Sequence, residues 1–544
     1  MKVYEALASS FYRLELGTCF ALLGDANMHW ASSLSDLGNR FVYTRHEHAA
    51  VAAATAYARG SGKVGFASVT CGPGLTQIMT ILPIAVRAKV PLIIFAGEAP
   101  LNKNWYNQMI SQAPFVEACG AEYVALHDLN GMIESTYSAI NLAATECRPV
   151  VLGVPLDQQQ ESFTGIIKNP LSKPLLGPHF VNKPIKKDIK DAAKLISNSK
   201  KSIILAGLGA RSKGSVNAIE KLAHLTGSLV ATTLPAKGIF HDKDFCLGVA
   251  GGYSSDLARE IFASAETVVA IGARMASHTF DNGNLTPNAK VIQINIDARS
   301  YVQGRKVADL SIKADAQLAT NLLIDEIKNI PQKSWRTTSM KKAALSALRL
   351  PAYTPPIDGL MHPLEVIGIL QKIIPKHCHI INTSGHCAYY TAQMNDHPQS
   401  HFTVIREFGA IGNGTSFALG IAERYTDRPV ILIEGDGSAM MNIQELETMK
   451  RYNMNILTIV LNDGGFGSEF HKLRAAGASL EGSIFGRPDF AAIGTSFGLI
   501  GSTVKTSLDL TTAVNYFLED NRPAICDVHI SDKVASPQIT RANF

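Results

Sequence analysis

The strongest constraint on the fold is a strand–turn–helix–strand pattern in residues 429–465. The apolar run 429–433 leads into the tetrapeptide GDGS at 435–438. A second apolar run, 456–461, leads into NDGG at 462–465. This pattern predicts a βαβ unit, in which the two strands are parallel and joined by a right-handed crossover.

The segment between the two strands predicts a helix with a defined start. Asn442 is a favourable N-cap, and Glu445, three residues later, can complete a capping box. Ile443, Leu446 and Met449 then form an apolar stripe at helical spacing.

Two aspartates mark the carboxyl ends of these strands. Asp436 and Asp463 each follow a strand, and ligands bind at that edge of an open α/β sheet. Glycines beside them let the backbone approach a ligand closely. The pattern predicts a hard cation that bridges the protein to a phosphate. The alternative is an ordinary βαβ unit whose aspartates lie in solvated turns.

Length and composition narrow the class of protein. A chain of 544 residues exceeds a single core, so about three domains are expected. A hydrophobic content of 46% and a formal charge of +5 indicate a well-packed protein without a nucleic-acid-binding surface. We find no run long enough to span a membrane, no signal-peptide pattern and no CxxC pair among the eight cysteines. A cytoplasmic location with reduced thiols is therefore expected.

Strand-length apolar runs alternate with helical stretches along the chain. This rhythm predicts an α/β fold of three doubly wound parallel-sheet domains. The expected domains are 1–165, 188–330 and 360–532, followed by a polar tail, 533–544. A connector with four prolines, 169–187, separates the first two domains. The similar rhythm of the first and third domains indicates that they are related.

A second group of chemistry-bearing residues lies in the first domain. Glu47 opens an alanine-rich helix, where a glutamate alone indicates only a favourable contact with the helix dipole. The sequence CGPG at 71–74 forms a tight turn after another strand, again at the expected ligand edge. His46, His48 and His471 are further candidates for acid–base work near neutral pH.

The RHE sequence at 45–47, together with the segments around Asp436 and Asp463, resembles the thiamine-diphosphate enzymes of the acetohydroxyacid synthase and pyruvate decarboxylase superfamily. The resemblance covers nearly the whole chain. It implies a pyrimidine-binding domain, a central Rossmann-like domain and a diphosphate-binding domain, in that order. It also implies thiamine diphosphate and Mg²⁺ as cofactors.

The resemblance assigns roles to individual residues. Glu47 matches the glutamate that protonates the cofactor's pyrimidine ring, and Asp436, Asp463 and the carbonyl of Gly465 match the Mg²⁺ ligands. The other implied cofactor-binding residues lie in glycine-rich turns and loops: Gly72, Ser384, Gly385, His386, Gly409, Ile411, Gly437 and Ser438. Asp463 is a departure, since the family usually has Asn there, and its extra charge is expected to lower cofactor affinity.

Further positions bear on the reaction. Asp25 and Glu469 match catalytic positions of the simple 2-oxo-acid decarboxylases, whereas the paired histidine of those enzymes is absent from 99–112. The expected substrate pocket contains Gln77, Trp105, Phe466 and Glu469.

The implied function is decarboxylation of a 2-oxo acid with ligation to a carbonyl acceptor, as in acetolactate synthases. The alternatives within the superfamily are a simple decarboxylase and a C–C bond lyase or hydrolase. Outside it, the glycine-rich turn at 207–209 leaves a nucleotide- or CoA-binding oxidoreductase open, and a non-catalytic cofactor-binding scaffold also stays open. FAD in the central domain is undecided. The expected assembly is a homodimer or homotetramer with active sites at the subunit interface.

Overall fold

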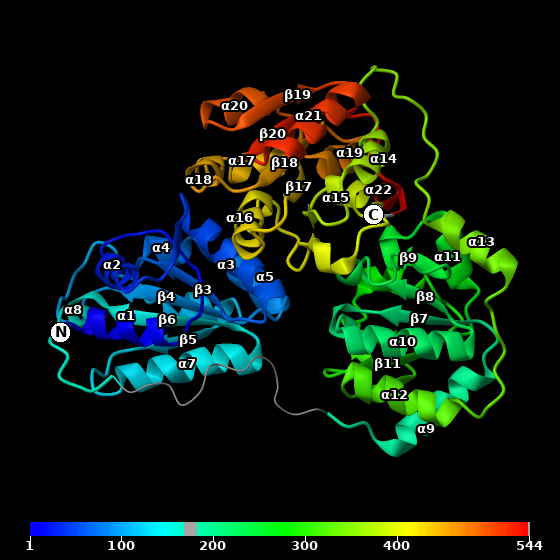
Figure 1. The fold of residues 1–544 in the computed structure, drawn as a ribbon, viewed down its shortest axis with the longest axis horizontal. Coiled ribbons are helices and arrows are strands. Elements are labelled where there is room, and N and C mark those ends of the chain that lie inside the picture. The colour runs from blue at the N-terminus through cyan, green and yellow to red at the C-terminus, as the bar shows by residue number, and fades with distance from the viewer. Residues whose placement is uncertain (168–181, 542–544) are drawn as a thin grey trace.

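The computed structural model describes residues 1–167 and 182–541, with the backbone alone at 60, 61, 540 and 541. Three six-stranded sheets, each with helices packed against it, form three domains (Figure 1). Every strand pairing within these sheets is parallel, which confirms the predicted fold class. Most of the predicted connector 169–187 lies outside the described residues.

The N-terminal sheet has the strand order β2-β1-β3-β4-β6-β5. Its strands are β1 (Cys19–Ala21), β2 (Phe41–Tyr43), β3 (Gly65–Val69), β4 (Leu92–Glu98), β5 (Glu122–Ala125) and β6 (Pro149–Pro155). The helices are α1 (Val3–Arg13), α2 (Met28–Asp36), α3 (Glu47–Ser61), α4 (Pro73–Thr76), α5 (Ile81–Arg87), α6 (Ala113–Ala118), α7 (Met132–Glu146) and α8 (Leu156–Gln159).

The central sheet has the order β14-β11-β10-β7-β8-β9. Its strands are β7 (Ser202–Ala206), β8 (Leu229–Thr232), β9 (Cys246–Val249), β10 (Thr267–Ile271), β11 (Lys290–Asn295) and β14 (Leu310–Lys313), with a small hairpin of β12 (Tyr301–Val302) and β13 (Arg305–Lys306). The helices are α9 (Lys186–Asn198), α10 (Lys213–Thr226), α11 (Asp256–Ala263), α12 (Ala316–Ile327) and, in the following linker, α13 (Thr338–Ala347).

The C-terminal sheet, β16-β15-β17-β18-β20-β19, repeats the N-terminal order strand for strand, as expected for related domains. Its strands are β15 (His379–Asn382), β16 (Phe402–Val404), β17 (Val430–Gly435), β18 (Ile456–Asn462), β19 (Ile500–Val504) and β20 (Ala524–His529). The helices are α14 (Pro363–Ile373), α15 (Cys387–Thr391), α16 (Gly414–Arg424), α17 (Asp436–Met441), α18 (Glu445–Arg451), α19 (Gly467–Ala475), α20 (Phe490–Ser496), α21 (Ser507–Asp520) and α22 (Pro537–Arg541).

The capping box predicted at Asn442 is wrong. The crossover contains two short helices, and the Asn442 amide donates a hydrogen bond to the carbonyl of Gly412. The Glu445 carboxylate is buried and accepts hydrogen bonds from the backbone N–H of Arg45 and the hydroxyl of Thr448. Contacts with other parts of the fold therefore replace the local cap.

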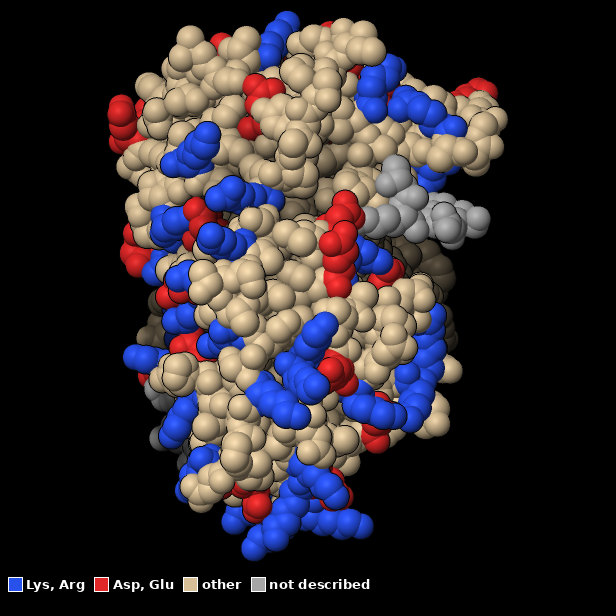
Figure 2. Space-filling model, turned by 90° about the vertical axis from the view of Figure 1, so that its right-hand side faces the viewer, with Lys and Arg blue, Asp and Glu red and all other residues tan. Residues whose placement is uncertain are grey.

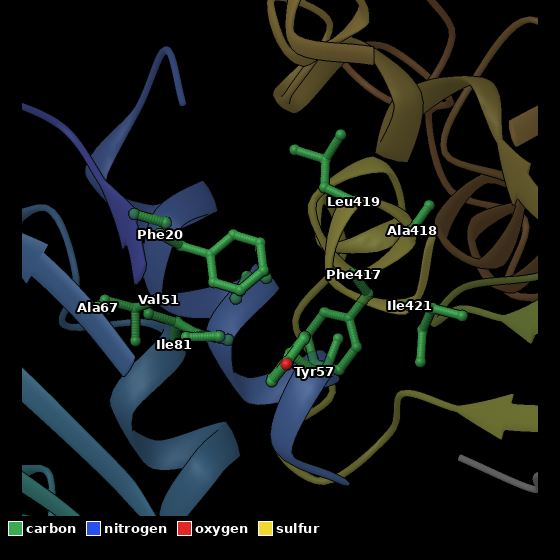
Figure 3. Close-up of a cluster of buried hydrophobic side chains, with 14 of the residues drawn as sticks. Phe20, Val51, Tyr57, Ala67, Ile81, Phe417, Ala418, Leu419 and Ile421 are labelled. Carbon is green, nitrogen blue, oxygen red and sulfur yellow. The ribbon is translucent and has the colours of Figure 1, made fainter. Parts of the chain in front are cut away.

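The N-terminal and C-terminal domains share one core through α3 and α16. Figure 3 shows part of this core, with Val51 and Tyr57 of α3 and Phe417 of α16. The two helices approach closely, because a Cβ atom at Gly420 would lie 2.0 Å from the carbonyl oxygen of Ala53. The alanine-rich sequence of α3 permits this approach.

Charge is unevenly spread over the face seen in Figure 2. Lys and Arg side chains gather in the lower half, over the central domain, and acidic side chains lie among them. Among the described residues, we find no helix that combines the length and apolar character needed to cross a bilayer.

Candidate active site

A cavity lies at the carboxyl edge of the C-terminal sheet, where the neighbouring strands β15, β17 and β18 end. It encloses about 460 Å³ of empty space, including the part open to solvent. Sequence reasoning assigned eleven of its lining residues a role: Ser384, Gly385, His386, Ile411, Asp436, Gly437, Ser438, Asp463, Gly465, Phe466 and Glu469. The strand topology thus brings together residues from four separate stretches of the chain.

Asp436 is held by backbone donors from two strand ends. One carboxylate oxygen accepts a hydrogen bond from the N–H of Gly437 at 2.8 Å. The other accepts from the N–H groups of Gly464 at 2.8 Å and Gly465 at 3.1 Å. The carboxylate is therefore oriented before any ligand binds.

Asp463 places a second carboxyl group in the same buried cavity. Burial and the charge of Asp463 raise the pKa of Asp436, and burial raises the pKa of Asp463. A buried like-charged pair is unfavourable unless a cation joins it. In residues 1–167 and 182–541 we find no group of three or more His, Cys, Asp or Glu side chains arranged for a metal. The hard oxygen donors of the pair are of the kind that a divalent cation such as Mg²⁺ takes, and such a cation commonly takes phosphate and water oxygens as further ligands.

His386 connects Asp463 to the C-terminal tail. Its Nδ1 lies 3.7 Å from an oxygen of Asp463, and its Nε2 accepts a hydrogen bond from the N–H of Ser536 at 3.0 Å. Burial lowers the pKa of His386 to about 4, so the ring is neutral near pH 7. Since Nε2 accepts, the single ring proton is on Nδ1, facing Asp463.

The segment that carries Gly409 and Ile411, both predicted to bind the cofactor, is attached to the same site. The N–H of Gly412 donates to the hydroxyl of Ser438 at 2.9 Å, and that hydroxyl donates to buried Glu434 at 2.8 Å. Ile411 lines the cavity, whereas Gly409 is exposed and has a φ of 79°. A positive φ favours glycine, which accounts for the residue at this turn.

The predicted site residues of the N-terminal domain gather elsewhere. Asp25, Glu47 and Gly72 follow β1, β2 and β3, which are neighbours in the sheet. Thr70 joins them, because a Cβ atom on Gly74 would lie 2.8 Å from the methyl carbon of Thr70 and 3.5 Å from Glu47 Oε1. Asp25 also raises the pKa of Cys71, although burial is the larger cause. These residues do not line the C-terminal cavity.

The residues expected to form the substrate pocket also lie in two different domains. Phe466 and Glu469 line the cavity, and the Glu469 side chain is exposed. Gln77 and Trp105 lie on the N-terminal domain, both exposed, with Trp105 exposing 75% of its surface. The single chain therefore leaves the two halves of the predicted pocket apart.

Two histidine candidates are unsuited to acid–base work near neutral pH. Burial lowers the pKa of His48 to about 4 and that of His471 to about 3. His48 contacts Asn413, and the ring of His471 lies 4.8 Å from that of His386. Both rings are therefore neutral near pH 7.

Sequence reasoning missed several residues of the cavity wall. Tyr390 lines it and donates a hydrogen bond to the carbonyl of Val534 at 3.1 Å. Gly467 packs so closely that a Cβ atom there would lie 2.6 Å from an oxygen of Asp463. The glycines that follow Asp463 could have indicated that Gly467 also lies at the site. No local sequence pattern predicts the contact between Tyr390 and the tail.

Comparison with known proteins agrees with this geometry. Three domains of the thiamine pyrophosphate (thiamine diphosphate) enzymes match the chain: the N-terminal TPP binding domain at 1–115, the central domain at 189–323 and the C-terminal TPP binding domain at 383–528. The matched ranges follow the three sheets in order.

Similar proteins span nearly the whole chain. A probable acetolactate synthase large subunit of Methanocaldococcus jannaschii is 28% identical over 99% of this chain and 93% of its own length. The chloroplastic acetolactate synthase of Arabidopsis thaliana is 26% identical over 96% and 80%. An acetolactate synthase large subunit of Parasynechococcus marenigrum is 25% identical over 90% and 81%. With all three domains matched in order, the chain belongs to the thiamine pyrophosphate enzyme family.

Proposed function

We propose that this protein catalyses the thiamine-diphosphate- and Mg²⁺-dependent decarboxylation of a 2-oxo acid and ligates the remaining fragment to a carbonyl acceptor. The observation that carries the proposal is the buried carboxylate pair of Asp436 and Asp463 beside glycine turns in one cavity. The acetolactate synthases that resemble this chain along most of its length support ligation as the outcome.

Asp436, Asp463 and the carbonyl of Gly465 would hold Mg²⁺, and diphosphate oxygens would complete its ligands. The backbone N–H groups of Gly437 and Ser438, in the first turn of α17, would bind the diphosphate. Ser384, Gly385 and His386 would close the opposite wall of the cavity. Ile411, which lines the cavity, would contact the cofactor, and Gly409 lies in the same loop.

Bound thiamine diphosphate supplies a carbon nucleophile and an electron sink for loss of carbon dioxide. Glu47, which lies beside the turn at Gly74, would hold a proton against the cofactor's pyrimidine ring. Glu469, which lines the cavity, would exchange a proton with the substrate, and Asp25 would do so from the N-terminal domain. Phe466, Gln77 and Trp105 would shape the pocket and exclude water.

A complete site requires a second copy of this chain, because Glu47 does not line the cavity that contains Asp436. Large apolar side chains are exposed on both halves: Leu23 (46%) and Trp105 (75%) on the N-terminal domain, Met441 (57%) and Phe485 (44%) on the C-terminal domain. Exposed apolar surface of this kind favours association. A homodimer is the smallest assembly we propose, and a homotetramer would contain two such pairs.

A simple decarboxylase is the second candidate, and the placement of Glu469 in the cavity favours it.

In the central domain, a Cβ atom on Gly207 would lie 2.3 Å from the carbonyl oxygen of Gly272, and one on Gly209 would lie 3.0 Å from it. Close strand-end packing accounts for both glycines, and the proposed cofactors are thiamine diphosphate and Mg²⁺. The eight cysteines, all without disulfides, support a cytoplasmic location.

The test is a panel of 2-oxo acids, each incubated with thiamine diphosphate and Mg²⁺, with and without an added aldehyde or a second 2-oxo acid. Carbon dioxide and the ligated product are measured together. Ligated product in proportion to carbon dioxide supports the proposal. Free aldehyde as the main product would favour the simple decarboxylase, and no carbon dioxide from any acid would reject both.

A further inference from the structure

The loop 404–413, which carries Gly409 and Ile411, is anchored at both ends to the N-terminal domain. It joins β16 to α16, and both anchors involve the single helix α3. Because Glu47 opens this helix, α3 takes part in two separate regions of the proposed site.

Arg59, in the last turns of α3, holds the first end of the loop. Its guanidinium donates a hydrogen bond to the carbonyl of Val404 at 2.9 Å and pairs with the carboxylate of Glu407. The two charged side chains are largely buried, with 12% and 13% of their surfaces exposed. Buried pairs of this kind are costly to break on one side only.

Arg87, at the end of α5, adds to the same anchor. It donates to the carbonyl of Glu407 at 3.3 Å. Its guanidinium carbon also lies 4.5 Å from the centre of the Phe408 ring, within range of a cation–π contact. Two arginines of one domain thus hold consecutive residues of the other.

His48, in the first turn of α3, holds the second end. Its Nε2 lies 2.8 Å from the side-chain oxygen of Asn413, whose amide donates to the carbonyl of Ala410 at 3.0 Å. Since the amide nitrogen of Asn413 is a donor, Nε2 of the neutral imidazole carries the proton in this contact.

The helix that bears both anchors is rigidly placed. His48 and Arg59 are about 16 Å apart along its axis at a rise of about 1.5 Å per residue. Between them α3 packs against α16 in the shared core, as Figure 3 shows around Tyr57 and Phe417. The separation of the two loop ends is therefore set by one packed helix.

We propose that Arg59, Arg87 and His48 are positioning residues that hold the loop 404–413 in its cofactor-binding shape before the cofactor arrives. The inference rests on the proposed function, since it assigns Gly409 and Ile411 to the cofactor. If the loop is already ordered, less conformational entropy is lost when the cofactor binds, and the cofactor binds more tightly.

The test compares two arginines that each join the N-terminal and C-terminal domains. Arg59→Met removes the loop anchor. Arg40→Met is the matched control, because Arg40 binds Glu423 at the far end of α16 at 2.5 and 2.9 Å. The readouts are amide hydrogen exchange of a peptide covering 404–413 in the cofactor-free protein and the Kd of thiamine diphosphate by calorimetry with Mg²⁺.

In Arg59→Met, we expect loop exchange to quicken about tenfold or more and Kd to rise by a similar factor. Arg40→Met is expected to leave the exchange rate and the Kd within about twofold, since its pair with Glu423 lies at the end of α16 away from the loop. Arg59→Lys is expected to keep one of the two Arg59 contacts. Its loop exchange rate and its Kd should therefore lie between those of Arg59→Met and the unmodified protein. Glu407→Gln, which keeps the side-chain shape, is the second variant if Arg59→Met does not fold.

Equal loop exchange in the Arg59→Met, Glu407→Gln and unmodified proteins would overturn the inference. Equal effects of Arg59→Met and Arg40→Met on loop exchange and Kd would also overturn it. Faster loop exchange in Arg59→Met with an unchanged Kd would do the same. Failure of the unmodified protein to bind thiamine diphosphate would instead contradict the proposed function, on which the exchange measurement does not depend.

Discussion

The carboxylate of Asp436 accepts a hydrogen bond from the backbone N–H of Gly464 at 2.8 Å. This bond ties the end of β17 to the turn after β18, and the Gly437 N–H holds the other carboxylate oxygen. The oxygen that accepts only the Gly437 N–H keeps a lone pair for a metal. The two strand ends therefore form one unit, into which Asp463 brings a second buried negative charge.

Replacing Asp463 by Asn should strengthen cofactor binding. Asparagine still offers an oxygen to Mg²⁺, while the repulsion from Asp436 and from the diphosphate is reduced. We expect the Kd of thiamine diphosphate at saturating Mg²⁺ to fall about tenfold, measured by calorimetry. Asp427→Asn, a change on the exposed side chain of Asp427, is the control. Weaker binding by the Asp463→Asn protein would show that its charge is needed for the metal.

Replacing Glu47 by Gln should abolish turnover and spare cofactor binding. Glutamine keeps the size of the side chain in contact with the Gly74 turn but cannot transfer a proton. We expect kcat to fall by about 10²–10⁴-fold, with the Kd of thiamine diphosphate within a few fold of the unmodified protein. Full activity in this variant would reject the proposed role of Glu47.

The buried carboxyl group of Glu434 should make the cofactor-free protein less stable as pH rises. Burial raises its pKa from 4.5 to about 7, so the folded state binds more protons than the unfolded state between these values. The free energy of unfolding contributed by Glu434 is therefore highest below this window and is lost as pH rises through it.

Buried histidines such as His48 act in the opposite direction, so the comparison must be made against Glu434→Gln. Urea unfolding at about pH 5 and pH 8 should show the unmodified protein losing more stability, relative to this variant, at the higher pH. A difference that is constant with pH, or that changes in the other direction, would contradict the raised pKa.

Gly420 should be essential to the contact between α3 and α16. A Cβ atom there would lie 2.0 Å from the carbonyl oxygen of Ala53, so Gly420→Ala must force the helices apart. We expect a loss of about 1–3 kcal/mol in the free energy of unfolding. Gly368→Ala in α14 is the matched control, because its Cβ would meet only the end of the Leu350 side chain, at 3.2 Å. Similar losses in both variants would argue against the close helix contact.

Local patterns predicted the strands and the two aspartates because each depends on neighbouring residues. The apolar runs before Asp436 and Asp463 set the strand ends, and parallel pairing then placed both carboxyl groups at one edge. The strand Ile456–Asn462 matches the predicted run 456–461 to within one residue for the same reason, since its residues are all buried.

Contacts between distant segments could not be predicted in the same way. The local sequence predicts that Glu445 caps a helix. In the structure its carboxylate instead accepts a hydrogen bond from the backbone N–H of Arg45, which belongs to the N-terminal domain. The bond between Ser536 and His386 likewise joins residues 150 positions apart. Local residue patterns also do not predict the distance between Glu47 and the cavity, because that distance depends on how whole domains are arranged.

The most direct measurement is the binding of thiamine diphosphate to the purified protein at increasing Mg²⁺ concentration, followed by calorimetry. We predict one site per chain, an affinity that rises with Mg²⁺, and loss of binding in Asp436→Asn with the fold retained by circular dichroism. Binding that is independent of Mg²⁺, or unchanged in Asp436→Asn, would contradict the cofactor site described here.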